Sequence, residues 1–86
     1  NSPNPFNPET TLYFTLAKNN TPVSLNIYNL KGQLVRHLVS GVLASGKHSC
    51  VWNGLDDAGK EVSSGVYFSR LFTPDNQQTR KMLLAK

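Results

Sequence analysis

The sequence is poor in cysteine, in charge and in long apolar runs, and each shortage excludes a class of protein. One cysteine, Cys50, cannot form an intrachain disulfide, which excludes the disulfide-rich secreted scaffolds but not export itself. No apolar stretch reaches the roughly 18 residues of a spanning helix, so we expect no membrane span. Charged residues make up only 16%. A surface that depends instead on Ser, Thr, Asn and Gln suits a β-rich extracellular module.

The basic residues are dispersed along the chain. The formal net charge is +4, from nine Lys and Arg against five Asp and Glu, and only Arg80 and Lys81 are adjacent. Nucleic-acid binding requires a basic stripe with interleaved aromatic residues. The sequence has no such stripe, so we expect no nucleic-acid partner.

The length of 86 residues predicts one domain. A hydrophobic content of 38% is enough for one modest core, but not for a core and an enclosed active-site cavity. We therefore expect no enzymatic activity and no cofactor. Because the sequence begins at Asn1 without Met or a signal peptide, we interpret it as a fragment of a larger protein, in which any export signal lies upstream.

The first residues form a proline-rich segment. Pro3, Pro5 and Pro8 fall within eight residues, and each fixes its own φ and favours extended geometry in the residue before it. We interpret residues 1–9 as a stiff lead-in linker that joins an upstream cargo domain to a domain at 10–86.

Apolar and polar residues alternate with a period of two over most of the remaining chain, which predicts short strands. The predicted strands cover 11–16, 23–28, 33–40, 47–53, 61–62, 66–73 and 77–85, and Gly41 to Gly46 is predicted to be a loop. Turn signals separate them about every 8–12 residues. The pattern predicts an all-β, immunoglobulin-like antiparallel sandwich of about seven strands, without the Cys…Trp…Cys spacing of antibody domains.

His48 and Cys50 are the one pair that resembles a catalytic base and nucleophile, because residues two apart on a strand share a face. No third group is evident to orient the imidazole, and Trp52 continues the same face inward. We therefore expect Cys50 and Trp52 to fill the core, with His48 at its rim.

Two binding chemistries remain open. Oxygen ligands gather around one turn, as calcium sites require, at Asn53, Asp56, Asp57 and Glu61. Their spacing matches no calcium loop, so we favour an ordinary Asp-x-Gly turn. Exposed Tyr13, Tyr28 or Phe72 would form a sugar-binding platform, although strands carry aromatic residues for other reasons. One cysteine and two histidines do not supply a zinc site, and no phosphate-binding loop is present.

The tail from 79 to 86 combines basic and apolar residues. As structure, it is the last strand, with either Leu83 or the pair Met82 and Leu84 turned inward. In a functional interpretation, the tail is a basic edge strand to which another protein can bind by strand addition. The two interpretations are compatible.

Eight short phrases follow one another in a specific order and spacing. They are Pro3–Pro8 with Thr10–Leu12, Val23–Tyr28, Gly32–Val35, Gly46–His48, Trp52–Gly54, Asp57–Gly59, Ser64–Tyr67 and Lys81–Leu83. Over its whole length the chain resembles the C-terminal sorting domains (Por secretion tails) of the type IX secretion system. It equally resembles the immunoglobulin-like domain of flagellar hook-capping proteins.

The resemblance to sorting domains implies a seven-stranded sandwich at the end of a secreted enzyme or adhesin. It implies recognition by an outer-membrane translocon, removal by a sortase-like peptidase, and a secreted or cell-surface location reached through the periplasm. The family features carry over to Pro3, Asn4 and Pro5 at the start, Gly65 and Tyr67 in a late strand, and Lys81 and Lys86 in the tail.

These residues have physically reasonable roles. Gly65 permits a conformation closed to other residues, so that Tyr67 anchors the adjacent strand. Arg80, with Lys81 and Lys86, supplies attraction to an acidic receptor surface. Two departures from the family matter: Cys50 stands at a commonly β-branched position, which supports core packing, and Asn53 replaces a common Asp, which weakens the calcium interpretation.

Three functions compete. The first is a non-catalytic sorting domain that addresses an upstream cargo for translocation and surface attachment. The second is a structural assembly module like the hook-capping domain, and the third is a carbohydrate-binding accessory module.

Overall fold

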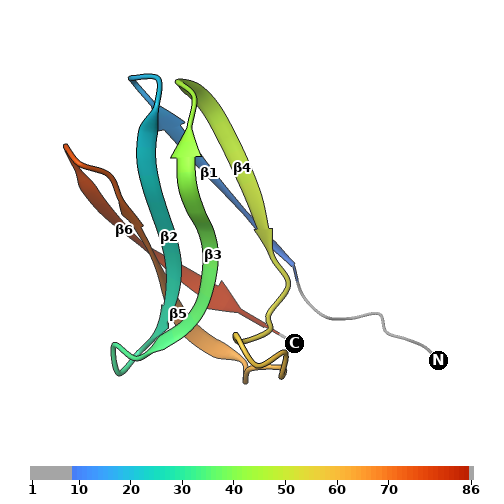
Figure 1. Ribbon diagram of the computed structural model, residues 1–86. Helices are drawn as coiled ribbons and strands as arrows, with labels where there is room; N and C mark the ends of the chain where they lie inside the picture. The colour runs from blue at the N-terminus through green and yellow to red at the C-terminus, as the bar shows by residue number, and fades with distance from the viewer. Residues whose placement is uncertain (1–8, 86) are drawn as a thin grey trace.

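A computed structural model describes residues 9–85 as a sandwich of two antiparallel sheets (Figure 1). The strands are β1 (Thr10–Leu16), β2 (Thr21–Asn29), β3 (Leu34–Leu43), β4 (Gly46–Trp52), β5 (Gly65–Phe72) and β6 (Gln77–Leu84). One sheet pairs β1 with β4, and the other has the order β3-β2-β5-β6. The predicted all-β, immunoglobulin-like class is confirmed, with six strands between residues 9 and 85 rather than about seven. None of the described residues belongs to a helix that could cross a membrane.

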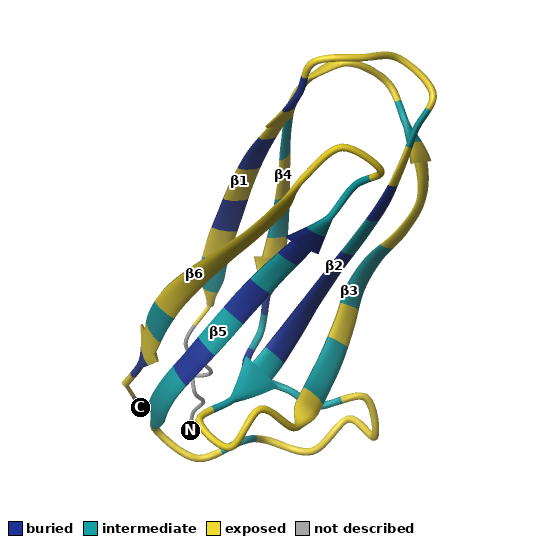
Figure 2. Cartoon of the chain, turned by 90° about the vertical axis from the view of Figure 1, so that its left-hand side faces the viewer, coloured by how far each residue is buried: buried dark blue, intermediate teal, exposed yellow. Residues whose placement is uncertain are grey.

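The alternation in the sequence becomes alternation in burial. From Thr11 to the end of β1, exposed and buried residues alternate, which Figure 2 shows as alternating bands. The same period holds in β5. The inward residues of both sheets form one core, namely Leu12, Phe14, Leu16, Val23, Leu25, Ile27, Trp52, Tyr67, Leu71 and Leu84.

Trp52 and Ile27 are the largest fully buried side chains of the core. The Trp52 indole N–H donates a hydrogen bond to the carbonyl of Leu55 at 2.9 Å, so its polar atom is satisfied inside the protein. Its ring meets the Tyr67 ring edge-on, with centroids 5.2 Å apart. Trp52 therefore joins the end of β4 to β5 across the sandwich.

The predicted loop from Gly41 to Gly46 is wrong. β3 continues to Leu43 and β4 starts at Gly46, so that residues 44–45 alone connect the two strands. Gly41 has φ +150° and still pairs with Val23 of β2. A glycine within an edge strand can bend the strand without ending it. Gly41 therefore marks a bend in β3, not the start of a loop.

The predicted short strand at Glu61 and Val62 is also not a strand. Glu61 forms one isolated bridge, with Leu55. The Asp56 carboxylate accepts hydrogen bonds from the backbone N–H groups of Ala58 and Lys60 at 3.0 and 2.9 Å. These bonds fold the chain into a compact turn. The backbone N–H groups that donate to Asp56 are then not available for pairing with a neighbouring strand.

The ends of the sandwich have a simple arrangement. β1 begins and β6 ends at the same end of the sandwich (Figures 1 and 2). The predicted lead-in linker at 1–9 lies outside the described residues except for Glu9, and Lys86 lies outside them too.

Candidate functional site

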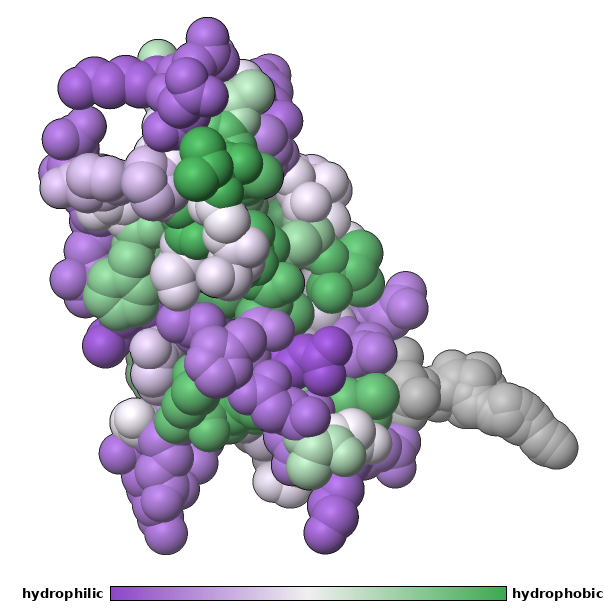
Figure 3. Space-filling model, in the orientation of Figure 1, coloured by the Kyte–Doolittle hydropathy of each residue, from purple (hydrophilic) through white to green (hydrophobic). Residues whose placement is uncertain are grey.

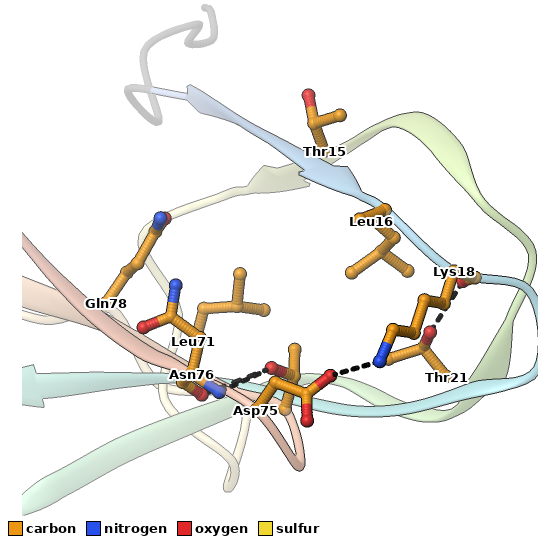
Figure 4. Close-up of a pocket in the computed structure, with 10 residues that line it drawn as sticks. Thr15, Leu16, Lys18, Thr21, Leu71, Asp75, Asn76 and Gln78 are labelled. Carbon is orange, nitrogen blue, oxygen red and sulfur yellow. Dashed lines mark hydrogen bonds and ion pairs between the residues drawn. The ribbon is translucent and has the colours of Figure 1, made fainter.

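The two sheets have unequal widths, and a groove opens where the wider one is uncovered. The groove has a volume of about 280 Å³ and lies between the end of β1 and the β5–β6 turn (Figure 4). Buried Leu16 and Leu71 form its floor. On its rim Lys18 Nζ lies 3.2 Å from Asp75 Oδ2. This ion pair is exposed and contributes little stability, so the rim can open.

A smaller hollow continues the groove along β1 and shares Leu71 and Gln78 with it. Arg80 of β6 spans this hollow, because its Nη1 atom donates a hydrogen bond to the carbonyl of Tyr13 in β1 at 3.4 Å. The groove and the hollow together separate the free side of β1 from β6.

Among the described recognition residues, the adjacent Arg80 and Lys81 lie on opposite faces of β6. Arg80 shares the inner face of β6 with Leu84, whereas Lys81 faces outward beside Phe68 of β5. Adjacent residues of a strand point to opposite faces, so the basic pair does not form one patch. Pro3, Asn4, Pro5 and Lys86 lie outside the described residues.

Gly65 and Tyr67 form a structural corner at the start of β5. Gly65 has φ +152°, a conformation that residues with a side chain rarely adopt. Tyr67 is buried, and its hydroxyl donates a hydrogen bond to the carbonyl of Ser63 at 2.7 Å. A tyrosine that bonds back to the chain just upstream matches the tyrosine corner of immunoglobulin-like sandwiches. This bond ties Tyr67 to the segment just before β5, and the role of Tyr67 in recognition by a partner stays a prediction.

Tyr67→Phe tests this corner. We expect it to lower the free energy of unfolding by about 1 kcal/mol, because it removes one hydrogen bond and leaves the Ser63 carbonyl without its donor. Urea denaturation followed by circular dichroism measures the change. Tyr13→Phe removes an exposed hydroxyl and serves as the control. Equal stability of the two variants would contradict the role given to Tyr67.

His48 and Cys50 share a face of β4, as predicted, but each side chain contacts other residues of the protein. The His48 ring stacks on Phe14 with centroids 5.3 Å apart, and its Nε2 lies 2.7 Å from the carbonyl of Ala44. Cys50 is half-buried, and burial raises the pKa of its thiol. A thiol held in its neutral form is a poor nucleophile, so this geometry supports core packing.

The carboxylates of the acidic turn already accept hydrogen bonds from backbone N–H groups of the protein. The Asp56 carboxylate caps its own turn, and the Asp57 carboxylate accepts a hydrogen bond from the His37 backbone N–H at 2.9 Å. Asp57 Oδ2 also lies 2.6 Å from His37 Nδ1. Between residues 9 and 85 no group of three or more His, Cys, Asp or Glu side chains is placed to hold a metal ion.

The contact of Asp57 with His37 makes stability depend on pH. The hydrogen bond from the His37 backbone lowers the pKa of Asp57, and the His37 side chain and the Arg36 charge lower it further. A depressed pKa in the folded state contributes stability above the unfolded pKa, and this contribution is lost as the pH falls through the folded value.

We therefore expect the melting temperature to fall on acidification below about pH 4, and Asp57→Asn to remove part of that dependence. Thermal melts between neutral and acidic pH measure it, and titration of the Asp57 carboxyl by NMR provides the independent readout. An Asp57→Asn variant with the acid dependence of the original chain would contradict the assignment.

The outer face of the four-stranded sheet carries aromatic side chains. Tyr28 and Phe68 lie opposite one another on β2 and β5, and Arg70 lies over the Tyr28 ring at 5.0 Å. At the edge of the sandwich, where β3 and β4 lie nearest the viewer, Figure 3 shows hydrophobic side chains interspersed with polar ones. Tyr13 is 67% exposed but belongs to the opposite outer face. Of the three aromatic residues considered for a sugar-binding platform, Tyr13 therefore lies on a different face from Tyr28 and Phe72, which are both half-buried.

Sequence reasoning missed two features of these surfaces. The period of two from Val66 onward places Phe68, Arg70 and Phe72 on one face, so the aromatic face was readable from the sequence. The contact between Arg80 and Tyr13 joins residues 67 positions apart. No local pattern signals it, because it depends on which strands share a sheet.

These features define an immunoglobulin-like β-sandwich domain, in which a tyrosine corner supports a two-plus-four arrangement of strands. The chain belongs to the FlgD Ig-like domain family, whose model matches residues 6–71. Among solved structures it is similar to the crystal structure of FlgD from P. aeruginosa, with a TM-score of 0.71 and 25% sequence identity. The match covers 90% of this chain and 61% of that chain. Among curated proteins, no sequence matches.

Proposed function

We propose that this domain is a non-catalytic structural assembly module, which contacts other proteins through its sheet faces and edges. The observation that carries the proposal is the family match over residues 6–71 of an immunoglobulin-like sandwich. One similar solved chain is FlgD, and the sequence resembles the immunoglobulin-like domain of hook-capping proteins. A module of this kind holds subunits in place and needs no reactive group.

The arrangement of the reactive side chains supports a role without catalysis. Nucleophilic catalysis needs an activated nucleophile, a base and a group that orients the base. Burial raises the pKa of the Cys50 thiol, and the His48 ring is held by Phe14 and Ala44. Neither side chain is placed to activate the other.

Binding to a filament protein tests the assembly role. We expect the 86-residue chain to co-sediment with purified flagellar hook protein, or to self-associate in sedimentation velocity at micromolar concentration. Phe68→Ala and Arg70→Ala, on the outer face of the four-stranded sheet, identify whether that face takes part. A strictly monomeric chain that does not bind hook protein would overturn the assembly role.

A sorting role is the second candidate, and β6 is the observation that favours it. β6 begins at Gln77, beyond the residues that the FlgD Ig-like model matches, and it carries the Lys81–Leu83 phrase of the sorting domains. Lys81 is exposed on this strand. In this role an outer-membrane translocon and a sortase-like peptidase are the partners, and the cargo reaches the cell surface through the periplasm.

Fusion of residues 1–86 to a periplasmic reporter, in a host with type IX secretion, tests the sorting role. We expect export of the reporter, and we expect Lys81→Glu to reduce it while the domain remains folded. Full export by a fusion that lacks β6 would overturn this role. The two candidates are separable, because export and hook-protein binding are independent measurements.

A further inference from the structure

We propose that the free edge of β1 binds one extended segment of a partner protein, which joins the two-stranded sheet as a third strand. The segment has apolar side chains at alternate positions and an acidic side chain beside Arg80. This inference goes beyond the assembly role, because it names the surface, the mode of binding and the chemistry of the partner.

The backbone of β1 is available on one side. β1 pairs with β4 through seven consecutive residue pairs without a register shift, and no other strand between residues 9 and 85 pairs with it. In an antiparallel strand, alternate residues point both backbone groups to the same side. The Tyr13 carbonyl accepts from Arg80 of β6, so it points away from β4. By the two-residue period, Thr11 and Thr15 point the same way.

The other edges are protected in ways that β1 is not. Proteins guard exposed strand edges with charges, prolines, bulges or covering loops. β6 carries Arg80 and Lys81, β4 carries Lys47, and β3 has register shifts in its pairing with β2. β3 is also covered by a loop, whose Asp57 N–H donates to the Val35 carbonyl at 3.0 Å. β1, from Thr10 to Leu16, has no charged residue, proline or glycine.

The space beside β1 is suited to a single strand. Two strands face four, and β6 projects past the free side of β1 (Figure 2). A strand added to β1 would lie about 4.8 Å from it, above β5 and β6. Its inward side chains would rest on Leu12, Phe14 and Leu71, which line the hollow there. A second folded copy approaching edge to edge would meet β6 first.

The charges beside this edge favour an acidic partner. Arg80 lies beside the hollow, and its bond to the Tyr13 carbonyl is long, at 3.4 Å, so little is lost when it moves. A carboxylate on the added segment gives Arg80 a charge-assisted hydrogen bond instead. The other cation of the groove, Lys18, is already paired with Asp75. Arg80 is therefore the residue that favours an acidic side chain over a basic one on the added segment.

The test uses a labelled seven-residue peptide of alternating threonine and valine, in which the central valine is replaced by glutamate so that the carboxylate lies on the same inward face as the other valines, beside Arg80. We expect it to bind the 86-residue chain saturably in fluorescence anisotropy. A matched peptide with lysine in place of the glutamate is expected to bind at least fivefold more weakly. Arg80→Gln is expected to remove this difference between the peptides. Absence of saturable binding by the glutamate peptide would overturn the proposal.

Tyr13→Pro tests the edge itself. Proline removes the outward N–H of Tyr13 without removing a bond to β4, and edge strands tolerate it. We expect it to weaken peptide binding about fivefold or more, whereas Tyr13→Val, which keeps the N–H, retains binding. Circular dichroism checks that both variants fold. Equal affinity of the two folded variants would overturn the proposal.

Amide hydrogen exchange gives a measurement that needs no variant. We expect the N–H groups of Thr11, Tyr13 and Thr15 to exchange rapidly in the free chain and slowly with the glutamate peptide bound. Slow exchange in the free chain would show that its own residues cover the edge, and would overturn the proposal. Self-association that Tyr13→Pro abolishes would identify a second copy as the occupant and would overturn it equally.

Discussion

Trp52→Ala is expected to lower the free energy of unfolding by about 3–5 kcal/mol, the usual cost of removing a buried aromatic side chain. Trp52 is 1% exposed, its indole N–H bonds to Leu55 and its ring meets Tyr67. The variant loses both of these interactions as well as the buried indole ring, and leaves a cavity. Because domains of this size have total stabilities of about 5–15 kcal/mol, the variant is expected to be partly unfolded at physiological temperature.

The measurement is urea denaturation followed by far-ultraviolet circular dichroism, since the variant lacks the tryptophan needed for fluorescence. Val51→Ala is the matched control, because Val51 is the neighbour of Trp52 in β4 and is 51% exposed. We expect the control to change stability by no more than about 0.5 kcal/mol. Similar losses in both variants would show that the two faces of β4 are assigned incorrectly.

Leu84→Ala is expected to cost about 2–5 kcal/mol, whereas Leu83→Ala is expected to cost about 0.5 kcal/mol or less. The two residues are chemically identical and adjacent in β6, but Leu84 is 3% exposed and Leu83 is 75% exposed. The difference follows from the period of two, which turns Leu84 into the core. Thermal melts of both variants measure it, and equal melting temperatures would contradict the burial assigned to β6.

This comparison also decides how truncations of the tail are interpreted. A chain that lacks β6 loses Leu84 and the strand that pairs along β5, so that loss of export or binding can come from unfolding alone. Leu83→Ala keeps the core and alters one exposed apolar side chain. A functional defect in this variant, at unchanged stability, would therefore identify a contact with a partner.

Local pattern was sufficient to predict most strands and their inward faces. Leu12, Phe14 and Leu16 alternate with polar residues and are all buried. Successive side chains of a strand point to opposite faces, so these three share one face, and that face is turned to the core. Pattern was not sufficient where two signals compete. Gly41 weakens a strand locally, but its pairing with Val23 of β2 keeps the strand intact, and such pairing is not visible from one segment.

The surfaces were harder to predict than the fold. The pairing of His37 with Asp57 joins residues 20 positions apart, and the groove beside β1 depends on the division of six strands into sheets of two and four. The two-residue period predicts which residues of a strand face inward, but it does not predict which strands are neighbours in a sheet. The character of β6 as a basic edge strand was readable, while the position of Arg80 across from Tyr13 was not.

The shared position of the first and last strand ends has a mechanical consequence. Polypeptide joined on either side leaves from the same end of the sandwich, so that tension between the two attachments pulls across the strands rather than along them. Hydrogen bonds then open one after another, from Thr10 with Trp52 in one sheet and from Gly65 with Leu84 in the other. Under load the domain would peel apart at low force, while its opposite end, with the turns at 17–20 and 73–76, stays clear for contact.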